Sequence, residues 1–258
     1  NASPRARMAV VVAVLVGKEA FGGPGSYPFN PAAVGYCAAA ISWPQFIFRY
    51  PEPLGWLSRV EWSFSGFWRM FSYDGVTLAE GPALTLKNGG VPNIDTWNLL
   101  LGNYVGPLGV TASLVVLSCA VYLVVRKRLP LSAPISFLLV TALIAFLFPR
   151  APENAWSIMP WYNWLHRLSS VKFELLAGAL PFAAVFLVPE PCTLPKNTAS
   201  RMIYGAILGI ATMMFRYFGS YELGACFAFL LVNAISGYFD RALAARAGRK
   251  KVKEAVKT

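Results

Sequence analysis

The stretch Lys18-Glu-Ala-Phe-Gly-Gly-Pro-Gly-Ser-Tyr-Pro-Phe-Asn30 interrupts two apolar runs and precedes Pro31, where a helix can restart. Its charges and its cluster of glycine and proline predict a membrane helix that is broken in the middle. A second version, Arg216-Tyr-Phe-Gly-Ser-Tyr-Glu222, splits an apolar run from a helix predicted over Leu223–Phe239. Interrupted segments in both halves of a chain indicate a repeat-built bundle whose site lies where the broken helices meet.

Composition places the chain in a membrane. Of its 258 residues, 56% are hydrophobic and only 14% are charged, which is too little polar surface to cover a soluble protein of this size. The apolar runs have no strand-like alternation, so we predict an all-α polytopic membrane protein, an inverted-repeat helical bundle with broken half helices. The net charge of +11 comes from basic residues at the ends of predicted spans, which is typical of orientation in a lipid bilayer. We therefore expect no nucleic-acid partner.

The cysteines and the histidine give no sign of a metal site. The four cysteines have no metal-ligand spacing, and three of them lie in apolar runs. We predict small core residues rather than metal ligands or disulfides at Cys37, Cys119, Cys192 and Cys226. The lone His166, beside Arg167, is expected on the surface of an outer loop.

The chain divides into four segments: 1–44 with the first broken hairpin, 45–104 rich in aromatic residues, 105–239 with the second repeat, and a basic tail over 240–258. Beyond the first hairpin, clear spans are predicted over Pro107–Val125, Leu131–Phe148, Phe173–Val188, Met202–Phe215 and Leu223–Phe239. Because the first apolar run is short and the chain opens in mid-pattern, we expect further helices before it.

Basic residues between spans predict the sidedness. Arg126-Lys-Arg128 links two adjacent spans and should be cytoplasmic. Counting outward from it, the loop at 18–30 and the C-terminal tail are also cytoplasmic, and the aromatic segment 45–104 is extracytoplasmic. The two broken hairpins then face opposite sides, as an inverted repeat requires.

Several motifs together carry a family resemblance: the Lys18–Pro31 loop, Leu99-Leu-Leu-Gly-Asn103, Leu175-Leu-Ala-Gly178, Pro189-Glu-Pro-Cys-Thr193 and the stretch from Arg216 to Asn233. Their order and spacing resemble the membrane protein family that contains the RnfD subunit of the Rnf ferredoxin:NAD+ oxidoreductase and the NqrB subunit of the sodium-pumping NADH:quinone oxidoreductase (Nqr). The Rnf member is the more similar.

The resemblance implies an electron-carrying subunit of a multi-subunit redox complex in the bacterial cytoplasmic membrane, one that moves Na+ or H+. A flavin on the extracytoplasmic side would relay the electrons. We expect no catalytic residues and no metal in this chain, and no activity without the partner subunits.

The resemblance also implies a cofactor loop. Family members join FMN through its phosphate to a Thr in the pattern Asp-Gly-x-Ser/Thr-x-Ala-Thr, and this chain reads Asp74-Gly75-Val-Thr77-Leu-Ala-Glu80. A carboxylate at the acceptor position cannot form the phosphoester and would repel the phosphate. We therefore expect a flavin site at Asp74, Gly75, Thr77 and Glu80 that holds FMN without a covalent bond, or riboflavin, or that has degenerated.

The charged and turn residues at the two breaks are the remaining candidates. We expect them to line the pathway or to hold the broken hairpins, although snorkelling and local pairing are the ordinary roles of such side chains. They are Lys18, Glu19, Gly22, Gly23 and Asn30 in the first break, and Arg216 and Glu222 in the second. A solute channel or transporter of the same fold without redox activity is the alternative function. The flavin loop distinguishes the two.

Overall fold

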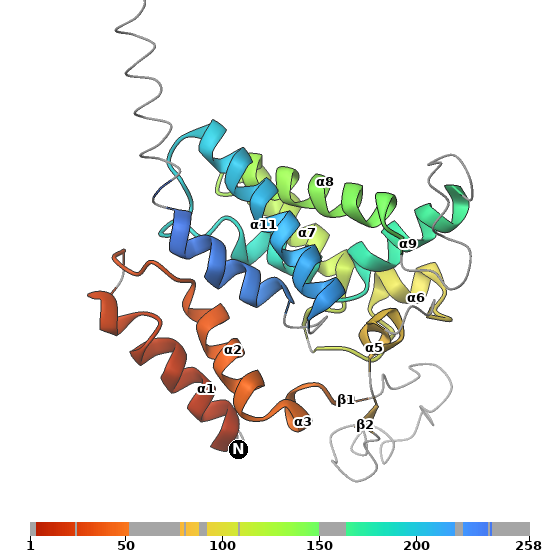
Figure 1. Ribbon diagram of the computed structural model, residues 1–258, viewed down its shortest axis with the longest axis horizontal. Coiled ribbons are helices and arrows are strands. Elements are labelled where there is room, and N and C mark those ends of the chain that lie inside the picture. The colour runs from red at the N-terminus through yellow and green to blue at the C-terminus, as the bar shows by residue number, and fades with distance from the viewer. Residues whose placement is uncertain are drawn as a thin grey trace, which may run out of the picture.

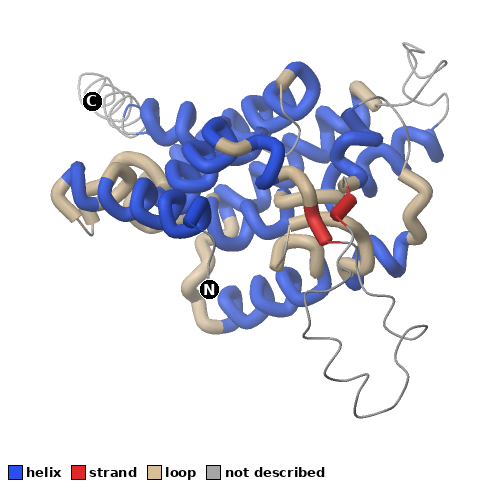
Figure 2. The backbone as a smooth tube through the Cα atoms, turned by 90° about the horizontal axis from the view of Figure 1, so that it is seen from below, coloured by secondary structure: helices blue, strands red, loops and turns tan. Residues whose placement is uncertain are grey.

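The computed structural model describes residues 4–23, 25–51, 78–79, 81–87, 92–107, 109–149, 164–219, 224–236 and 238, and these are mostly helical (Figures 1 and 2). The predicted all-α class is confirmed. The first half contains α1 (Pro4–Leu15), the 3-10 turn η1 (Glu19–Phe21), α2 (Pro31–Ser42), α3 (Pro44–Ile47), α5 (Pro82–Lys87) and α6 (Thr96–Leu101). The second half contains α7 (Ser113–Val125), α8 (Ser132–Leu147), α9 (Trp164–Leu176), α10 (Leu180–Phe182), the π-helical η2 (Ala183–Leu187), α11 (Thr198–Phe218) and a last helix over Gly224–Ser236.

The aromatic segment contributes a short β-ladder. Strands β1 (Tyr50–Pro51) and β2 (Leu78–Ala79) pair antiparallel, with Tyr50 opposite Ala79. Ala79 belongs to the predicted cofactor loop, and α5 starts three residues later. The pairing therefore places the residues just before position 80, and α5 contains those that follow from Pro82.

The helix after the first break begins where the sequence predicts. The buried Asn30 caps α2 by accepting hydrogen bonds from the backbone N–H groups of Ala32, at 3.0 Å, and Ala33, at 3.3 Å. Pro31 occupies the first helical position, where the missing N–H costs nothing. These two features restart the helix.

The predicted span over Phe173–Val188 is wrong in one respect, because the helix is broken. Residues 177–179 separate α9 from α10, and the two helical parts are bent by 63°. Gly178 has a φ of 121°, which an L residue rarely adopts, and Pro181 removes an N–H from the first turn of α10. This is a third helix break, which the apolar run hides.

The predicted span over Pro107–Val125 is too long. Its first part consists of turns, with Gly109 at a φ of 80°, and α7 begins only at Ser113. Likewise, position 166 lies within α9 rather than in an outer loop. Apolar composition alone does not reveal these boundaries.

The core lies between α8, the α10–η2 segment, α11 and the last helix. Its fully buried members include Phe137, Leu180, Tyr204, Leu208 and Phe229. At Gly205 an added Cβ would lie 2.4 Å from the carbonyl oxygen of Ala133, so glycine is what lets α11 approach α8 so closely. α11 and α8 form the most extensive helix pair described.

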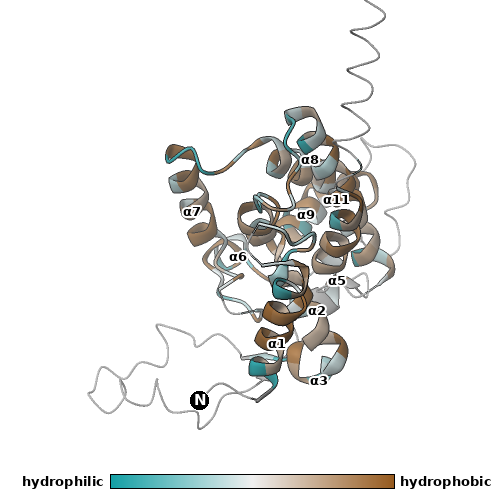
Figure 3. Cartoon of the chain, turned by 90° about the vertical axis from the view of Figure 1, so that its left-hand side faces the viewer, coloured by the Kyte–Doolittle hydropathy of each residue, from teal (hydrophilic) through white to brown (hydrophobic). Residues whose placement is uncertain are grey.

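Apolar side chains also cover the outside. Figure 3 shows α1, α7 and α8 as largely hydrophobic ribbons, and the exposed apolar side chains on α7 include Leu114, Val115, Leu117, Val121 and Val125. Within the described residues, α11 alone is long and apolar enough to cross a bilayer, and the bent pair Arg167–Leu176 with Leu180–Leu187 adds a second if it counts as one span. Four further apolar helices are shorter: Pro31–Ser42, Ser113–Val125, Ser132–Leu147 and Gly224–Ser236.

Candidate functional site

The second predicted break contains a buried ion pair. Arg216, in the last turn of α11, extends toward the end of α9 and donates hydrogen bonds to both the carboxylate of Glu174, at 3.0 Å, and its backbone carbonyl, at 2.7 Å. Both side chains are at most 2% exposed. The contact joins the end of α11 to the broken helix that sequence reasoning treated as continuous.

Burial makes this pair sensitive to the loss of either partner. Desolvating two charges costs as much as their attraction returns, so the pair adds little net stability, but removing one charge leaves the other uncompensated. Carbonyl groups at the end of α9 are natural acceptors for a cation because a helix C-terminus carries partial negative charge. Arg216 is thus held by the carboxylate and the backbone carbonyl of Glu174.

Tyr104 closes the other side of the break. Its hydroxyl donates to the carbonyl oxygen of Leu176, at 3.1 Å, and accepts from the N–H of Gly178, at 3.4 Å. Burial raises the pKa of Tyr104, and the Gly178 N–H and the positive charge of Arg216 oppose that rise. The Tyr104 hydroxyl therefore bridges the break, from the last carbonyl of α9 to the N–H of Gly178.

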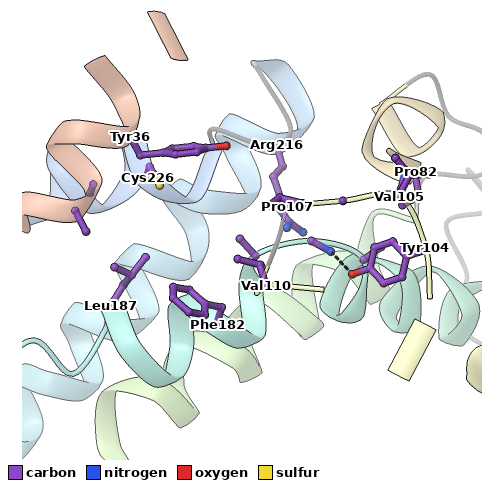
Figure 4. Close-up of a pocket in the computed structure, with 16 residues that line it drawn as sticks. Tyr36, Pro82, Tyr104, Val105, Pro107, Val110, Phe182, Leu187, Arg216 and Cys226 are labelled. Atoms are coloured by element: carbon purple, nitrogen blue, oxygen red, sulfur yellow. Dashed lines mark hydrogen bonds between the residues drawn. The ribbon is translucent and has the colours of Figure 1, made fainter. Parts of the chain in front are cut away.

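A pocket of about 240 Å³ lies against the break (Figure 4). Its wall is almost entirely apolar, and Arg216 is its one charged lining residue among those described. Figure 4 shows Tyr36 and Cys226 on one side, Phe182 and Leu187 on another, and Tyr104 with Pro82 toward the far end. Ala177, Gly178 and Ala179 line the pocket at the broken backbone.

This lining suits a flat, mostly apolar ring system. Aromatic and aliphatic walls exclude water, and a single buried cation favours an occupant that carries negative charge in one of its states. The lining residues that would receive such a group are the small residues at 177–179, the apolar walls and Arg216 at the edge.

The first break is built differently. Gly22 and Gly23 adopt left-handed φ angles of 97° and 82°, which turn the chain after η1. Lys18 is half-buried and Glu19 is exposed, so neither shares the environment of Arg216. Of the five residues predicted at this break, Asn30 has the clearest role, as the cap of α2.

A hydrogen bond connects the first break to a second motif. The Tyr27 hydroxyl donates to the Glu190 carboxylate at 2.6 Å, which brings the 18–30 loop onto the Pro189–Thr193 turn before α11. Hydrogen bonds with Cys192 and with Glu190 raise the pKa of Tyr27 above its ordinary value. The first break therefore lies near the start of α11 and the second at its end, about 30 Å away along that helix.

The predicted cofactor loop lies mostly outside the described residues. This applies to Asp74, Gly75, Thr77 and Glu80, and also to Glu222 at the second break. The residues that flank position 80 are described: Ala79 pairs with Tyr50, and Pro82 lines the pocket. Pro82, two residues beyond the predicted loop, thus lines the pocket that Arg216 borders.

Sequence reasoning missed Glu174, Tyr104 and Tyr27. Glu174 was the clearest available signal, because it is an acidic residue close to an otherwise apolar run. Arg167, the neighbour of His166 in the predicted outer loop, is buried in α9 and donates to the carbonyl oxygens of Phe146 and Leu147.

Residues 5–248 match the model of the NQR2, RnfD, RnfE family. The chain belongs to this family. Similar proteins include the D subunits of the ion-translocating oxidoreductase complexes of Shigella dysenteriae serotype 1 (strain Sd197) and of Escherichia coli O1:K1 / APEC. Each is 29% identical over 246 residues, which cover 88% of this chain and 66% of the relative. The chain thus spans just under two thirds of these relatives, and family membership confirms the predicted resemblance and a membrane protein.

Proposed function

We propose that the chain is a membrane subunit of an ion-translocating electron-transport complex of the Rnf type, in which a flavin relays electrons on the extracytoplasmic side. The support is the membership in the NQR2, RnfD, RnfE family, together with relatives named as D subunits of such complexes. The observation that carries the site is the apolar pocket, which Arg216 borders at one edge and Pro82, just beyond the predicted cofactor loop, at another.

The chain's own residues would hold and orient the cofactor. Phe182 and Tyr104 give apolar, aromatic walls that keep water from the ring, and Arg216 presents a fixed positive charge. Glu174 keeps the guanidinium in place at 3.0 Å. A bound flavin supplies one- or two-electron transfer, and the protein supplies position and electrostatics.

The remaining parts of the proposal concern the complex. Other subunits deliver and remove the electrons, because this sequence has no nucleotide-binding fingerprint and no cysteine ligand set of its own. The coupling ion is Na+ or H+, the donor and acceptor are of the ferredoxin:NAD+ type, and the C-terminus is cytoplasmic in the bacterial inner membrane.

The test is the flavin content of the purified complex. We expect a flavin absorbance that this subunit carries, and no fluorescent band for the chain on a denaturing gel, because Glu80 cannot hold FMN covalently. The variant Glu80→Thr should become covalently labelled where the flavin-transferring enzyme is present. A complex without any flavin assigned to this subunit would favour the transporter alternative and overturn the proposal.

A further inference from the structure

The link between α7 and α8 places a cluster of basic residues at the end of a largely hydrophobic helix (Figure 3). Arg126, Lys127 and Arg128 are all exposed. The nearest acidic residues in the sequence are Asp95 and Glu153, more than twenty positions away on either side. None of the three basic side chains forms an ion pair within the described part of the chain. The link therefore carries positive charge that the described residues do not balance.

Backbone groups, rather than these side chains, complete the end of α7. The N–H groups of Arg126, Lys127 and Arg128 donate to carbonyl oxygens in the last two turns of the helix, at 3.0, 2.9 and 2.9 Å. Lys127 has a φ of 55°, in the left-handed region where glycine is the common residue at such a helix end. The chain thus has a charge where the turn favours glycine, and capping the helix does not use the basic side chains.

One of the three cations is held against the outer face of α7. The Arg126 Nε donates to the Tyr122 hydroxyl at 3.3 Å, and the guanidinium carbon lies 5.6 Å from the centre of the Tyr122 ring. A tyrosine at the end of an apolar helix is typical of the membrane interface. Because this contact uses Nε, the two terminal NH₂ groups of the guanidinium can donate to a phosphate.

Exposed apolar side chains lead away from the basic cluster along α7. Leu114, Leu117, Val121 and Val125 recur at helical spacing and are between 48% and 74% exposed. The eleven residue steps from Leu114 to Val125 rise roughly 16 Å along the helix. Half of a bilayer's hydrocarbon core is about 15 Å thick. The stripe therefore matches the depth of one leaflet, whereas a spanning helix of a partner subunit would contact about twice that depth.

A second apolar face begins on the other side of the link. Leu131, Ile135 and Leu139 are 41%, 48% and 64% exposed, and they lead from the link along the first turns of α8. The main packing partners of α7 are α6, α10 and η2, and those of α8 are α11, α9 and η2. Packing in the core thus leaves exposed apolar surface on both helices next to the basic cluster.

We propose that the link and these two apolar faces form a binding site for an anionic phospholipid. Its phosphate binds Arg126, Lys127 and Arg128, and its acyl chains lie along α7 and the first turns of α8. Because the cluster is cationic, it favours a lipid with net negative charge over a zwitterionic one, and each basic residue near an anionic lipid surface strengthens binding roughly fivefold. The inference depends on the membrane location of the family and not on a flavin in the pocket.

The experiment compares two lipids on the intact complex. Purified complex is reconstituted into nanodiscs with equal amounts of phosphatidylglycerol and phosphatidylcholine, one of which carries a photoreactive diazirine in its acyl chain. After irradiation, peptide mapping measures the label on residues 113–125 and 132–139. We expect at least about fivefold more label from phosphatidylglycerol than from phosphatidylcholine on these peptides.

Matched variants test the role of the basic cluster. Arg126→Gln should lower the ratio of the two labels roughly fivefold, while Lys127 and Arg128 remain to orient the link. Lys196→Gln removes an exposed cation from the turn before α11 and should leave the ratio unchanged. Co-purification with the partner subunits shows that each variant is folded.

Three results would overturn the proposal. Equal labelling of the wild type by the two lipids would show that the basic cluster selects no charge. An equal fall of the ratio in the Arg126→Gln and Lys196→Gln variants would assign the preference to overall charge. A peptide 113–125 without lipid label would show that a partner subunit, rather than lipid, covers α7.

Discussion

The two broken hairpins have similar sequences but different packing. In the first, α1 and α2 pack on each other: an added Cβ at Gly35 would lie 2.6 Å from the Cβ of Ala13. In the second, α11 turns its glycines toward α8 instead, at Gly205 and Gly209. The main partner of α1 is therefore α2 of the same hairpin, with α2 also touching the last helix through Cys37 and Ala40, whereas the main partner of α11 is α8 in the core.

The difference in packing also determines how far the charged residues at the two breaks are buried. Lys18 and Glu19 follow α1, which packs on α2, and they are half-buried and exposed, respectively. Arg216 ends a helix packed in the core, where the broken end of α9 supplies Glu174. A charge at a helix break becomes a site only where a neighbouring element covers it.

The largest predicted effect on stability distinguishes the buried charge at the second break from the more exposed charge at the first. Arg216→Gln should lower the free energy of unfolding by about 3–5 kcal/mol, because it leaves Glu174 buried without its cation. Lys18→Gln, the matched change at the first break, should alter it by less than about 0.5 kcal/mol. Thermal unfolding of the complex measures both.

A double variant tests the cause. Glu174→Gln with Arg216→Gln should be less destabilising than the sum of the two single changes, since no buried charge is left alone. Additive effects would contradict the ion-pair account.

The next largest effect on stability distinguishes the packing of α11 on α8 from the packing of α1 on α2. Gly205→Ala should cost about 1–3 kcal/mol and weaken the whole core, because the new methyl group meets the backbone of α8. Gly35→Ala should instead loosen α1 and α2 locally. Amide hydrogen exchange distinguishes the two variants. An equal loss of protection in α8 for both would contradict the claim that the two hairpins pack differently.

A smaller effect concerns the cap of α2. Asn30→Ala removes the acceptor for two backbone N–H groups and should cost about 1 kcal/mol. Asn30→Asp keeps the acceptor and serves as the control. If the alanine and aspartate variants unfold alike, the cap does not restart the helix.

The smallest effect is a pH dependence at the first break. Because the pKa of Tyr27 is raised in the folded chain, its contact stabilises fully below about pH 10 and is lost as the pH rises through the folded value. Tyr27→Phe should remove this alkaline loss and cost within about 1 kcal/mol at neutral pH. An unchanged slope of stability against pH above 10 would exclude the contact.

The sequence predicted the parts of the fold that short-range chemistry determines. Asn30 and Pro31 mark a helix start by themselves, and apolar runs mark α8, α11 and the last helix. Contacts between residues far apart in the chain could not be predicted. Nothing in the sequence around Arg216 indicates that Glu174 is its partner. Gly178 and Pro181 signalled the break after α9, but the surrounding apolar residues outweighed them. That the hairpins form an inverted repeat stays a prediction.

The most direct test of the account is the flavin content of complexes altered on the pocket wall. Ala179→Phe fills the pocket beside the broken backbone, and Ala120→Phe makes the same change on α7, away from the described lining. We predict that the first variant loses at least about tenfold of the flavin bound by this subunit, whereas the second retains it. Equal flavin content in the two variants would contradict the claim that the pocket at the second break holds the cofactor.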